Sequence, residues 1–156
     1  MGRFDTKFGS ERSDWETPQA LFDLLDREFH FTLDAAADPS NTKCSSFLSR
    51  DDNALTCSWS GVCWLNPPYG DGSIGRWVRK AQEEGAKGCK VVMLIPARTN
   101  TNWWHEYVMR AAEVRFLRGR PKFGGATHGL PQPLAIVVFR SKQIATEFTS
   151  LDVRCV

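Results

Sequence analysis

Four consecutive residues, Asn66, Pro67, Pro68 and Tyr69, combine side-chain and backbone groups that could bind a planar amine. They follow the apolar run Val62–Leu65, which has the length and composition of a short buried strand. The prolines end this strand because they cannot donate to a sheet ladder, and each holds the preceding residue extended. The result is a rigid array of hydrogen-bond acceptors beside an aromatic ring, which suits a flat group with an exocyclic amine, such as adenine. A proline-rich turn closed by a tyrosine is the plain alternative.

Polar side chains also follow another expected strand. Residues 31–34 predict a strand that ends in Asp34, and the alanines after it let a ligand approach the backbone closely. An acidic residue at the carboxyl end of a first parallel strand is a usual place to hold a nucleoside cofactor. The polar loop 49–55 offers carboxylate and amide groups for the adenine of a cofactor, although its spacing equally fits an Asx turn. No Gly-x-Gly-x-x-Gly occurs, so the ordinary dinucleotide fingerprint is missing.

The elements expected around these residues alternate between helices and strands. Thr17 and Pro18 have the types of a helix cap and a first helical residue, and amphipathic spacing predicts a helix over Gln19–Phe29. Two further helices are expected, over Ile74–Ala86 and over 103–112, and Asn102 is expected to cap the second. Further strands are expected over Lys90–Pro96, 114–117 and Leu134–Phe139.

Continuous apolar strands between helices predict an open, mostly parallel α/β sheet with helices on both faces. Leu134–Phe139 follows the preceding strand without a helix, so it is expected to be an antiparallel last strand. In such sheets, ligands bind beyond the carboxyl ends of the parallel strands. Asp34, the 49–55 loop, residues 66–69 and Arg98 all fall at these expected positions, which predicts one shared binding site.

Size and composition indicate one domain. The chain has 156 residues, of which 42% are hydrophobic and 24% charged. We expect a flexible arm over residues 1–13, a single domain over 14–140 and a polar C-terminal tail over 141–156 that could hold a short helix. No apolar run approaches the ~20 residues of a membrane span and no apolar signal core begins the chain, so a cytoplasmic protein without a membrane partner is expected. The five cysteines include no Cys-x-x-Cys, and no metal site is predicted.

Charge is distributed unevenly along the chain, although the net charge is only +2. Residues 1–60 carry 11 acidic and 6 basic groups, whereas residues 61–156 carry 7 acidic and 14 basic groups. This asymmetry predicts a surface that faces an anion, with nucleic acid as the first candidate. A solvated basic face is the alternative.

Six segments of the chain together resemble the phage-type DNA adenine methyltransferase family, relatives of the Dam enzymes. The segments, which span residues 15 to about 139, are Trp15-x-Thr17-Pro18, Leu33-Asp34-x-Ala36-Ala37, Asn41-x-Lys43-Cys44, Trp64-x-Asn66-Pro67-Pro68-Tyr69, Trp77-x-x-Lys80-Ala81 and Phe116-Leu117-x-Gly119-Arg120-x-Lys122-Phe123. The resemblance implies a Rossmann-like class I methyltransferase fold, with S-adenosylmethionine as cofactor. It also implies that the exocyclic amine of adenine in DNA is the methyl acceptor, and that the enzyme is phage-encoded and works in the host bacterial cytoplasm.

The resemblance assigns the catalytic role to Asn66, Pro67, Pro68 and Tyr69. The Asn66 side-chain oxygen and the Pro67 carbonyl would accept hydrogen bonds from the target amine and orient its lone pair towards the methyl group. Tyr69 would stack on the target base, which must leave the helix to be reached. Phe123 would supply a second aromatic contact.

The cofactor-binding residues implied by the resemblance are Trp15, Thr17, Pro18, Asp34, Ala36, Asp52, Asn53 and Asn66. The first three match a segment near the methionine end of the cofactor. Asp34 matches the first cofactor motif, and Asp52 or Asn53 is expected near the cofactor adenine. The usual glycine-rich turn is replaced by residues 34–38, which leaves open which backbone groups touch the cofactor.

The order of the motifs leaves no room for a separate recognition domain, so none is expected, and we expect loops 70–76 and 119–132 to contact DNA. Arg118, Arg120 and Lys122 are the expected phosphate contacts, together with Phe123. A methyltransferase acting on RNA or on a protein glutamine amide is an alternative, as is a nucleic-acid-binding module without catalysis. Both a monomer and a homodimer are compatible with the sequence.

Overall fold

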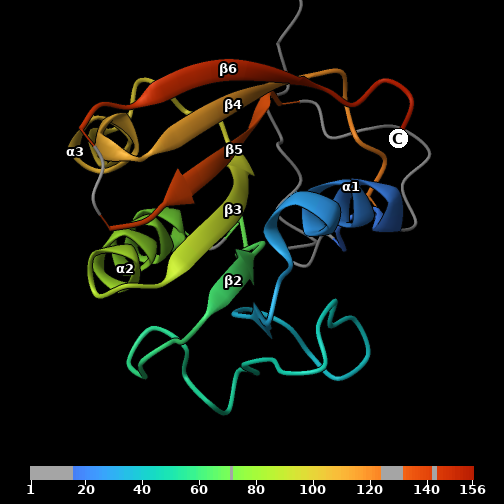
Figure 1. The fold of residues 1–156 in the computed structure, drawn as a ribbon, viewed down its shortest axis with the longest axis vertical. Coiled ribbons are helices and arrows are strands. Elements are labelled where there is room, and N and C mark those ends of the chain that lie inside the picture. Colours follow the sequence, from blue (N-terminus) through green and yellow to red (C-terminus); the bar gives the residue numbers. More distant parts are fainter. Residues whose placement is uncertain (1–15, 71, 124–131, 142–143) are drawn as a thin grey trace, which may run out of the picture.

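The computed structural model describes residues 16–70, 72–123, 132–141 and 144–156, and its strands form one six-stranded sheet (Figure 1). The strands are β1 (Leu33–Asp34), β2 (Val62–Leu65), β3 (Lys90–Pro96), β4 (Glu113–Arg118), β5 (Leu134–Phe139) and β6 (Glu147–Asp152). The helices are α1 (Gln19–Phe29), α2 (Ile74–Ala86), α3 (Asn102–Glu106) and the 3₁₀ helix η1 (Val108–Arg110). The expected bounds of α1, β2, α2, β3 and β5 agree with the structure to the residue. The arm expected over 1–13 and Trp15 lie outside the described residues.

The strands lie in the order β1-β2-β3-β5-β4-β6. β1 pairs parallel with β2, and β2 pairs parallel with β3. β5 is antiparallel to both β3 and β4, and β4 is parallel to β6. Two antiparallel pairings in succession restore the original direction, so β4 runs the same way as β1, β2 and β3. The prediction of a mostly parallel sheet with an antiparallel Leu134–Phe139 is confirmed.

Helices cover both faces of the sheet, as expected: α1 lies on one side, and α2 and α3 lie on the other (Figure 1). Buried apolar side chains of β3 and β5 form the centre of the core between these layers. Gly85 brings α2 close to the sheet, because a Cβ atom at this position would lie 2.9 Å from Phe139 Cβ and 3.1 Å from the Phe139 carbonyl carbon. A larger residue at position 85 would therefore push α2 away from β5.

Thr17 does not cap α1, which corrects the expectation for this residue. Pro18 has φ −54° and ψ 132°, which is extended rather than helical, so it is the residue before the helix and Gln19 is the first helical residue. No side chain makes a cap hydrogen bond there. The Thr17 hydroxyl instead accepts a hydrogen bond from the Asn66 side-chain nitrogen at 3.0 Å.

Two other elements differ from expectation. The helix expected over 103–112 is divided, because Tyr107 has φ −119° and interrupts the helix between α3 and η1. Thr101, rather than Asn102, precedes α3. Residues 141–156 contribute β6 rather than a short helix, and β6 pairs along the whole length of β4.

A buried ion pair attaches the chain before β2 to α2. Glu84 and Lys80 lie one turn apart, with side chains 1% and 8% exposed, and their charged atoms are 2.6 Å apart. Glu84 also accepts hydrogen bonds from the Trp59 backbone N–H and from Lys87, while Lys80 donates to the Cys57 carbonyl at 2.7 Å. The pair is therefore linked to two backbone groups of another segment, in addition to joining two turns of one helix.

We expect Glu84→Gln to destabilise the fold by about 3–5 kcal/mol, because it leaves the Lys80 charge buried without its carboxylate. Glu83→Gln is the matched control, since Glu83 pairs with Arg79 at the surface and should contribute little. Chemical denaturation of both variants measures the difference. Equal stability of the two variants would contradict the importance of the buried pair.

The Glu84 contribution should depend on pH. Burial raises the pKa of Glu84, but the hydrogen bonds from Lys80, Trp59 and Lys87 together outweigh burial and lower the pKa to about 2. The ionised carboxylate therefore stabilises the fold above its usual pKa of 4.5, and this stabilisation is lost as the pH falls towards 2. The stability difference between the natural protein and Glu84→Gln should shrink across that interval.

Candidate active site

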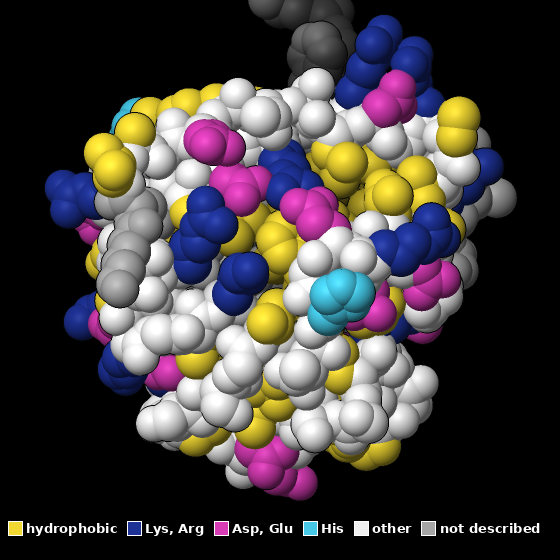
Figure 2. Space-filling model, in the orientation of Figure 1, with side chains coloured by type: hydrophobic (Ala, Val, Ile, Leu, Met, Phe, Trp, Pro, Cys, Tyr) yellow, Lys and Arg dark blue, Asp and Glu magenta, His cyan; other side chains and the backbone are white. Residues whose placement is uncertain are grey.

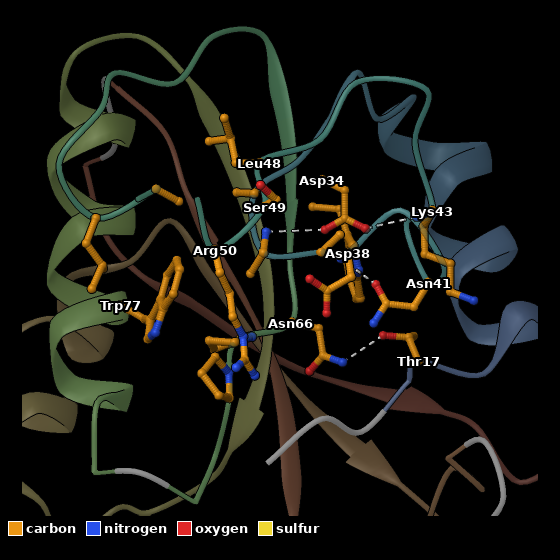
Figure 3. A pocket seen from close by; sticks show the side chains of 18 of the residues that line it. Thr17, Asp34, Asp38, Asn41, Lys43, Leu48, Ser49, Arg50, Asn66 and Trp77 are labelled. Atoms are coloured by element: carbon orange, nitrogen blue, oxygen red, sulfur yellow. Dashed lines mark hydrogen bonds between the residues drawn. The ribbon is translucent and has the colours of Figure 1, made fainter. Parts of the chain in front are cut away.

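A pocket of about 530 Å³ lies at the carboxyl ends of β1 and β2 (Figure 3). Its volume falls in the range of ~300–1,000 Å³ that is usual for small-molecule sites. The residues that line it are Glu16, Thr17, 34–38, Asn41, Lys43, 48–50, 53–55, Trp64, 66–68, Ser73, Arg76 and Trp77. Segments that are far apart in the sequence thus meet at the sheet edge at which the polar strand ends were expected to converge.

Asp34 shapes the pocket through its carboxylate. The side chain is buried, and its two oxygens accept hydrogen bonds from the backbone N–H groups of Lys43 and Ala36, at 3.0 and 3.4 Å (Figure 3). Burial raises the pKa of Asp34, and the two backbone hydrogen bonds oppose this rise. The carboxylate therefore holds together two segments of the pocket wall.

Asp38 is the carboxylate that faces the cavity. It lines the pocket, is only half-buried, and its carboxylate forms no hydrogen bond with another residue that the structure describes. The Asn41 side-chain oxygen accepts a hydrogen bond from the Asp38 backbone N–H at 2.8 Å, which orders the loop that carries both residues. Figure 3 shows the Asp38 carboxylate directed towards the cavity. Asp34, and not Asp38, was predicted as a site residue, although both acidic residues flank the same three alanines.

Asn66 forms one wall of the pocket at the end of β2. Its side-chain nitrogen donates to the Thr17 hydroxyl at 3.0 Å, and its side-chain oxygen accepts a hydrogen bond from the Tyr69 hydroxyl at 2.8 Å. Pro67 and Pro68 continue the wall. Within the described part of the chain, no backbone N–H donates to the Pro67 carbonyl. The acceptor groups expected at this strand end are therefore present at the cavity.

Tyr69 is not part of the pocket lining. Its side chain belongs to the hydrophobic core, at 4% exposure, and its hydroxyl lies 2.8 Å from the Leu94 carbonyl oxygen in β3. Burial raises the pKa of this phenol. The ring expected to stack on a flat ligand is thus buried in this structure, and its hydroxyl contacts a pocket residue, Asn66.

The other expected cofactor residues divide into two groups. Thr17, Ala36 and Asn53 line the pocket. Pro18 and Asp52 do not line it, and the Asp52 carboxylate is used within its own turn, where it accepts hydrogen bonds from the Ser49 backbone N–H and hydroxyl at 2.7 and 2.8 Å.

Several pocket residues were not predicted as site residues. Trp77 was assigned to the inward face of α2, yet its half-buried ring lines the cavity (Figure 3). Arg50 also lines it, beside the expected loop residues. Asn41 and Lys43 belong to a segment that was quoted only for the resemblance. Asn41, Lys43 and Trp77 all belong to segments that carried the family resemblance, and this membership is the signal that could have identified them as site residues.

The expected DNA-binding residues are placed at the same edge of the sheet as the pocket, but at some distance from it. Arg118, Arg120 and Lys122 are exposed at and beyond the carboxyl end of β4. β4 is three strand spacings from β2, which corresponds to roughly 14 Å. Phe123, expected as an aromatic contact, is 1% exposed and packs in the core.

The positive charges of the C-terminal half do not all contribute to one basic surface. Arg115 is tied to Glu28 and Glu113 by hydrogen bonds of 2.6–2.7 Å, which removes it from the expected basic surface. On the face shown in Figure 2, basic and acidic side chains are interspersed rather than gathered in one basic patch. Arg118, Arg120 and Lys122 are exposed basic residues at and beyond the carboxyl end of β4.

Within residues 16–70, 72–123, 132–141 and 144–156, His, Cys, Asp and Glu side chains form no group of three or more that could hold a metal ion. Over the same ranges, no helix has the length and apolarity needed to cross a membrane.

An open, mostly parallel α/β sheet with a pocket beyond its parallel strand ends is the architecture of enzymes that bind nucleotide-like cofactors. The match to the family described as DNA N-6-adenine-methyltransferase (Dam) covers residues 5–149, so the chain belongs to this family. The relationship expected from the sequence segments is thereby confirmed.

Three known proteins illustrate the similarity. The DNA N-6-adenine-methyltransferase of Haemophilus phage HP1 is 31% identical over 149 residues, which cover 88% of this chain and 86% of that protein. The protein of the same description from Escherichia phage T1 is 36% identical over 103 residues, 64% of this chain and 42% of that protein. A solved structure described as a predicted O-methyltransferase from Agrobacterium tumefaciens aligns with a TM-score of 0.39 at 16% identity, over 88% of this chain and 64% of that one.

We expect Asp34→Ala and Asp38→Ala to differ in their effect on stability. Asp34→Ala leaves two backbone N–H groups without their acceptor, which costs about 1–3 kcal/mol for each group that stays buried. Asp38→Ala removes no hydrogen bond to a described residue and should change stability by less than about 0.5 kcal/mol. Thermal and chemical denaturation of the two variants measure this difference, and a larger loss in Asp38→Ala would reverse the roles given to the two carboxylates.

Proposed function

We propose that the protein transfers a methyl group from S-adenosylmethionine to the exocyclic amine of adenine in DNA. Membership of the DNA N-6-adenine-methyltransferase family gives the reaction class and the acceptor. The observation that supports the residue assignment is the position of Asn66, Pro67 and Pro68 on the wall of a pocket of cofactor size.

The pocket residues fit the cofactor by their chemistry. Its volume of about 530 Å³ is large enough for a nucleoside joined to an amino acid. The Asp38 carboxylate and the Asn53 amide suit the hydroxyl and amine groups of such a molecule. The Trp77 ring offers a flat apolar surface of the kind on which a purine stacks. We therefore assign Asp38, Asn53 and Trp77 to cofactor binding, together with Thr17 and Ala36, while Asp34 supports the wall.

Asn66 and Pro67 are assigned to the target amine. When bound, S-adenosylmethionine supplies a methyl group that its sulfonium makes strongly electrophilic. The Asn66 side-chain oxygen and the Pro67 carbonyl accept the two amine hydrogens, which directs the nitrogen lone pair into the pocket. The same oxygens stabilise the positive charge that develops on the amine during transfer. The methylated amine then releases one proton to solvent. Orientation and charge stabilisation therefore account for catalysis without a strong general base.

The exposed basic residues at the end of β4 are assigned to the DNA backbone. A target adenine must leave the duplex to reach a pocket wall. The carboxyl end of β4, which carries Arg118, lies at the same sheet edge as the end of β2, three strand spacings away. This arrangement suits contacts of Arg118, Arg120 and Lys122 to phosphates beside the extruded base. These contacts would position the DNA without reading its sequence.

We expect Asn66→Ala to abolish methyl transfer while cofactor affinity stays within a few-fold of the natural protein. Asp38→Ala should instead weaken the binding of S-adenosylmethionine, and methyl transfer should fall because less cofactor is bound. Transfer of labelled methyl groups to unmethylated DNA measures activity, and calorimetry with S-adenosylmethionine measures affinity. A fully active Asn66→Ala variant would overturn the role of this residue.

The same assay separates the proposed substrate from the alternatives. RNA and a glutamine-containing peptide are offered beside DNA. If the protein binds the cofactor but transfers no methyl group to DNA of any sequence, the proposed function is wrong. Sequencing that maps methylated adenines in the product then identifies the recognised site.

We expect the double variant Arg120→Ser, Lys122→Ser to bind DNA less tightly, with a smaller dependence on salt. Each lost phosphate contact should lower the slope of log affinity against log salt by about 1. Arg27→Ser is the matched control, because Arg27 is exposed in the last turn of α1, just before β1 begins and therefore at the opposite edge of the sheet. Because the control removes one charge and the double variant removes two, half of the double variant's change of slope in the control would show that the effect comes from net charge alone.

A further inference from the structure

Two arginines line the pocket beside the residues that are already assigned. Arg50 belongs to the loop 49–55, and Arg76 lies in the first turn of α2. Both residues are exposed as well as lining the cavity, which places them at its mouth. A guanidinium is always charged in a protein and presents its N–H donors in one plane. This part of the pocket is therefore suited to an anion.

The cofactor alone gives these two arginines little to bind. S-adenosylmethionine carries two positive charges, on its sulfonium and its ammonium, against one carboxylate. Lys43 and Glu16, an ion pair at 3.1 Å that also lines the pocket, already offer one positive and one negative charge to an amino-acid group. Two further positive charges would repel the sulfonium. An anion that arrives with the other substrate is therefore needed beside Arg50 and Arg76.

The positive charges of the pocket lie at two separate places. Figure 3 shows Lys43 and Thr17 on one side of the cavity and Arg50 and Trp77 on the other, with Asn66 between them. Arg76 directly precedes Trp77 in α2 and lines the same pocket. The two arginines therefore flank Asn66 on the side away from Lys43.

DNA brings negative charge to this side of the pocket. An adenine that leaves the duplex takes its sugar and the adjoining phosphates with it. Arg118 is three strand spacings from β2, so it is placed to contact the neighbouring duplex rather than the extruded nucleotide. A phosphate of the extruded nucleotide needs cationic partners closer to Asn66, and Arg50 and Arg76 are exposed there.

We propose that Arg50 and Arg76 together bind a phosphate of the extruded target nucleotide. The inference rests on the proposed function, because it requires adenine in DNA as the methyl acceptor. Guanidinium groups suit this role, since each can donate two parallel hydrogen bonds to phosphate oxygens. One arginine comes from the loop before β2 and the other from α2, so the phosphate is held from two segments of the fold. No covalent bond forms or breaks in this step.

Arg50→Gln and Arg76→Gln test the proposal by removing the charge and keeping a polar side chain. We expect each to weaken DNA binding by about ten-fold, the size of a lost charge-assisted hydrogen bond. The slope of log affinity against log salt should fall by about 1. The affinity for S-adenosylmethionine without DNA should not fall. Arg79→Gln is the matched control, because Arg79 is an exposed residue of the same helix that pairs with Glu83 and does not line the pocket.

DNA with a single uncharged phosphate locates the contact. Sequencing of the methylated product first identifies the target adenine, and a methylphosphonate then replaces the phosphate on either side of it in turn. For the natural protein, one of these two replacements should lower affinity by about ten-fold. The double variant Arg50→Gln, Arg76→Gln should bind this DNA and unmodified DNA equally well, because the two changes remove the same interaction. Thermal denaturation checks that each variant is folded.

The outcomes separate this inference from the proposed function. A natural protein that binds the cofactor but methylates no DNA removes the proposed function, and this inference with it. If the natural protein methylates DNA and the arginine variants bind DNA as tightly as it does, only the inference is wrong. A loss of cofactor affinity without a loss of DNA affinity overturns it as well, because the arginines then bind the cofactor carboxylate. An equal effect of Arg79→Gln, or of the methylphosphonate on the double variant, also contradicts it.

Discussion

The antiparallel pairing of β5 with both β3 and β4 determines where the charged end of β4 lies. The two reversals of direction make β4 run the same way as β2. Arg118 therefore leaves the sheet at the same edge as Asn66. Without the inserted strand, a β4 paired antiparallel to β3 would place this arginine at the opposite edge. The position of the basic surface relative to the pocket thus follows from backbone pairing, and the side chains only supply the charge.

Much of the fold could be predicted because its elements carry local signals. Residues 91–95 are continuously apolar and are followed by Pro96, and α1 has its apolar residues on one face, so both elements could be bounded from the sequence. The elements that were missed depend on tertiary context. Nothing local in Glu147–Asp152 shows that β4 has an edge to accept it. Likewise, the break at Tyr107 is a backbone conformation that helix-like spacing does not reveal.

Within the site, residue types were easier to predict than the directions of side chains. Asn66 was placed at the cavity because two prolines fix the strand end beside it. Asp34 ends β1 and Asp38 follows it, and periodicity does not distinguish the carboxylate that accepts backbone hydrogen bonds from the one that faces the pocket. Tyr69 and Phe123 show the same limit, since an aromatic residue near a site is equally able to stack on a ligand or to pack in the core.

The buried pair of Glu84 and Lys80 has a consequence for the pocket, because Ala54 lies in the wall and its carbonyl accepts a hydrogen bond from the Trp59 indole at 2.9 Å. Trp59 in turn donates its backbone N–H to Glu84. This side of the cavity is therefore ordered before any ligand arrives, and α2 contributes Trp77 to it as part of the same rigid unit. A ligand that contacts this wall loses little affinity to the conformational entropy of ordering it. An ion pair outside the pocket thereby preorganises the surface that a flat ring would meet.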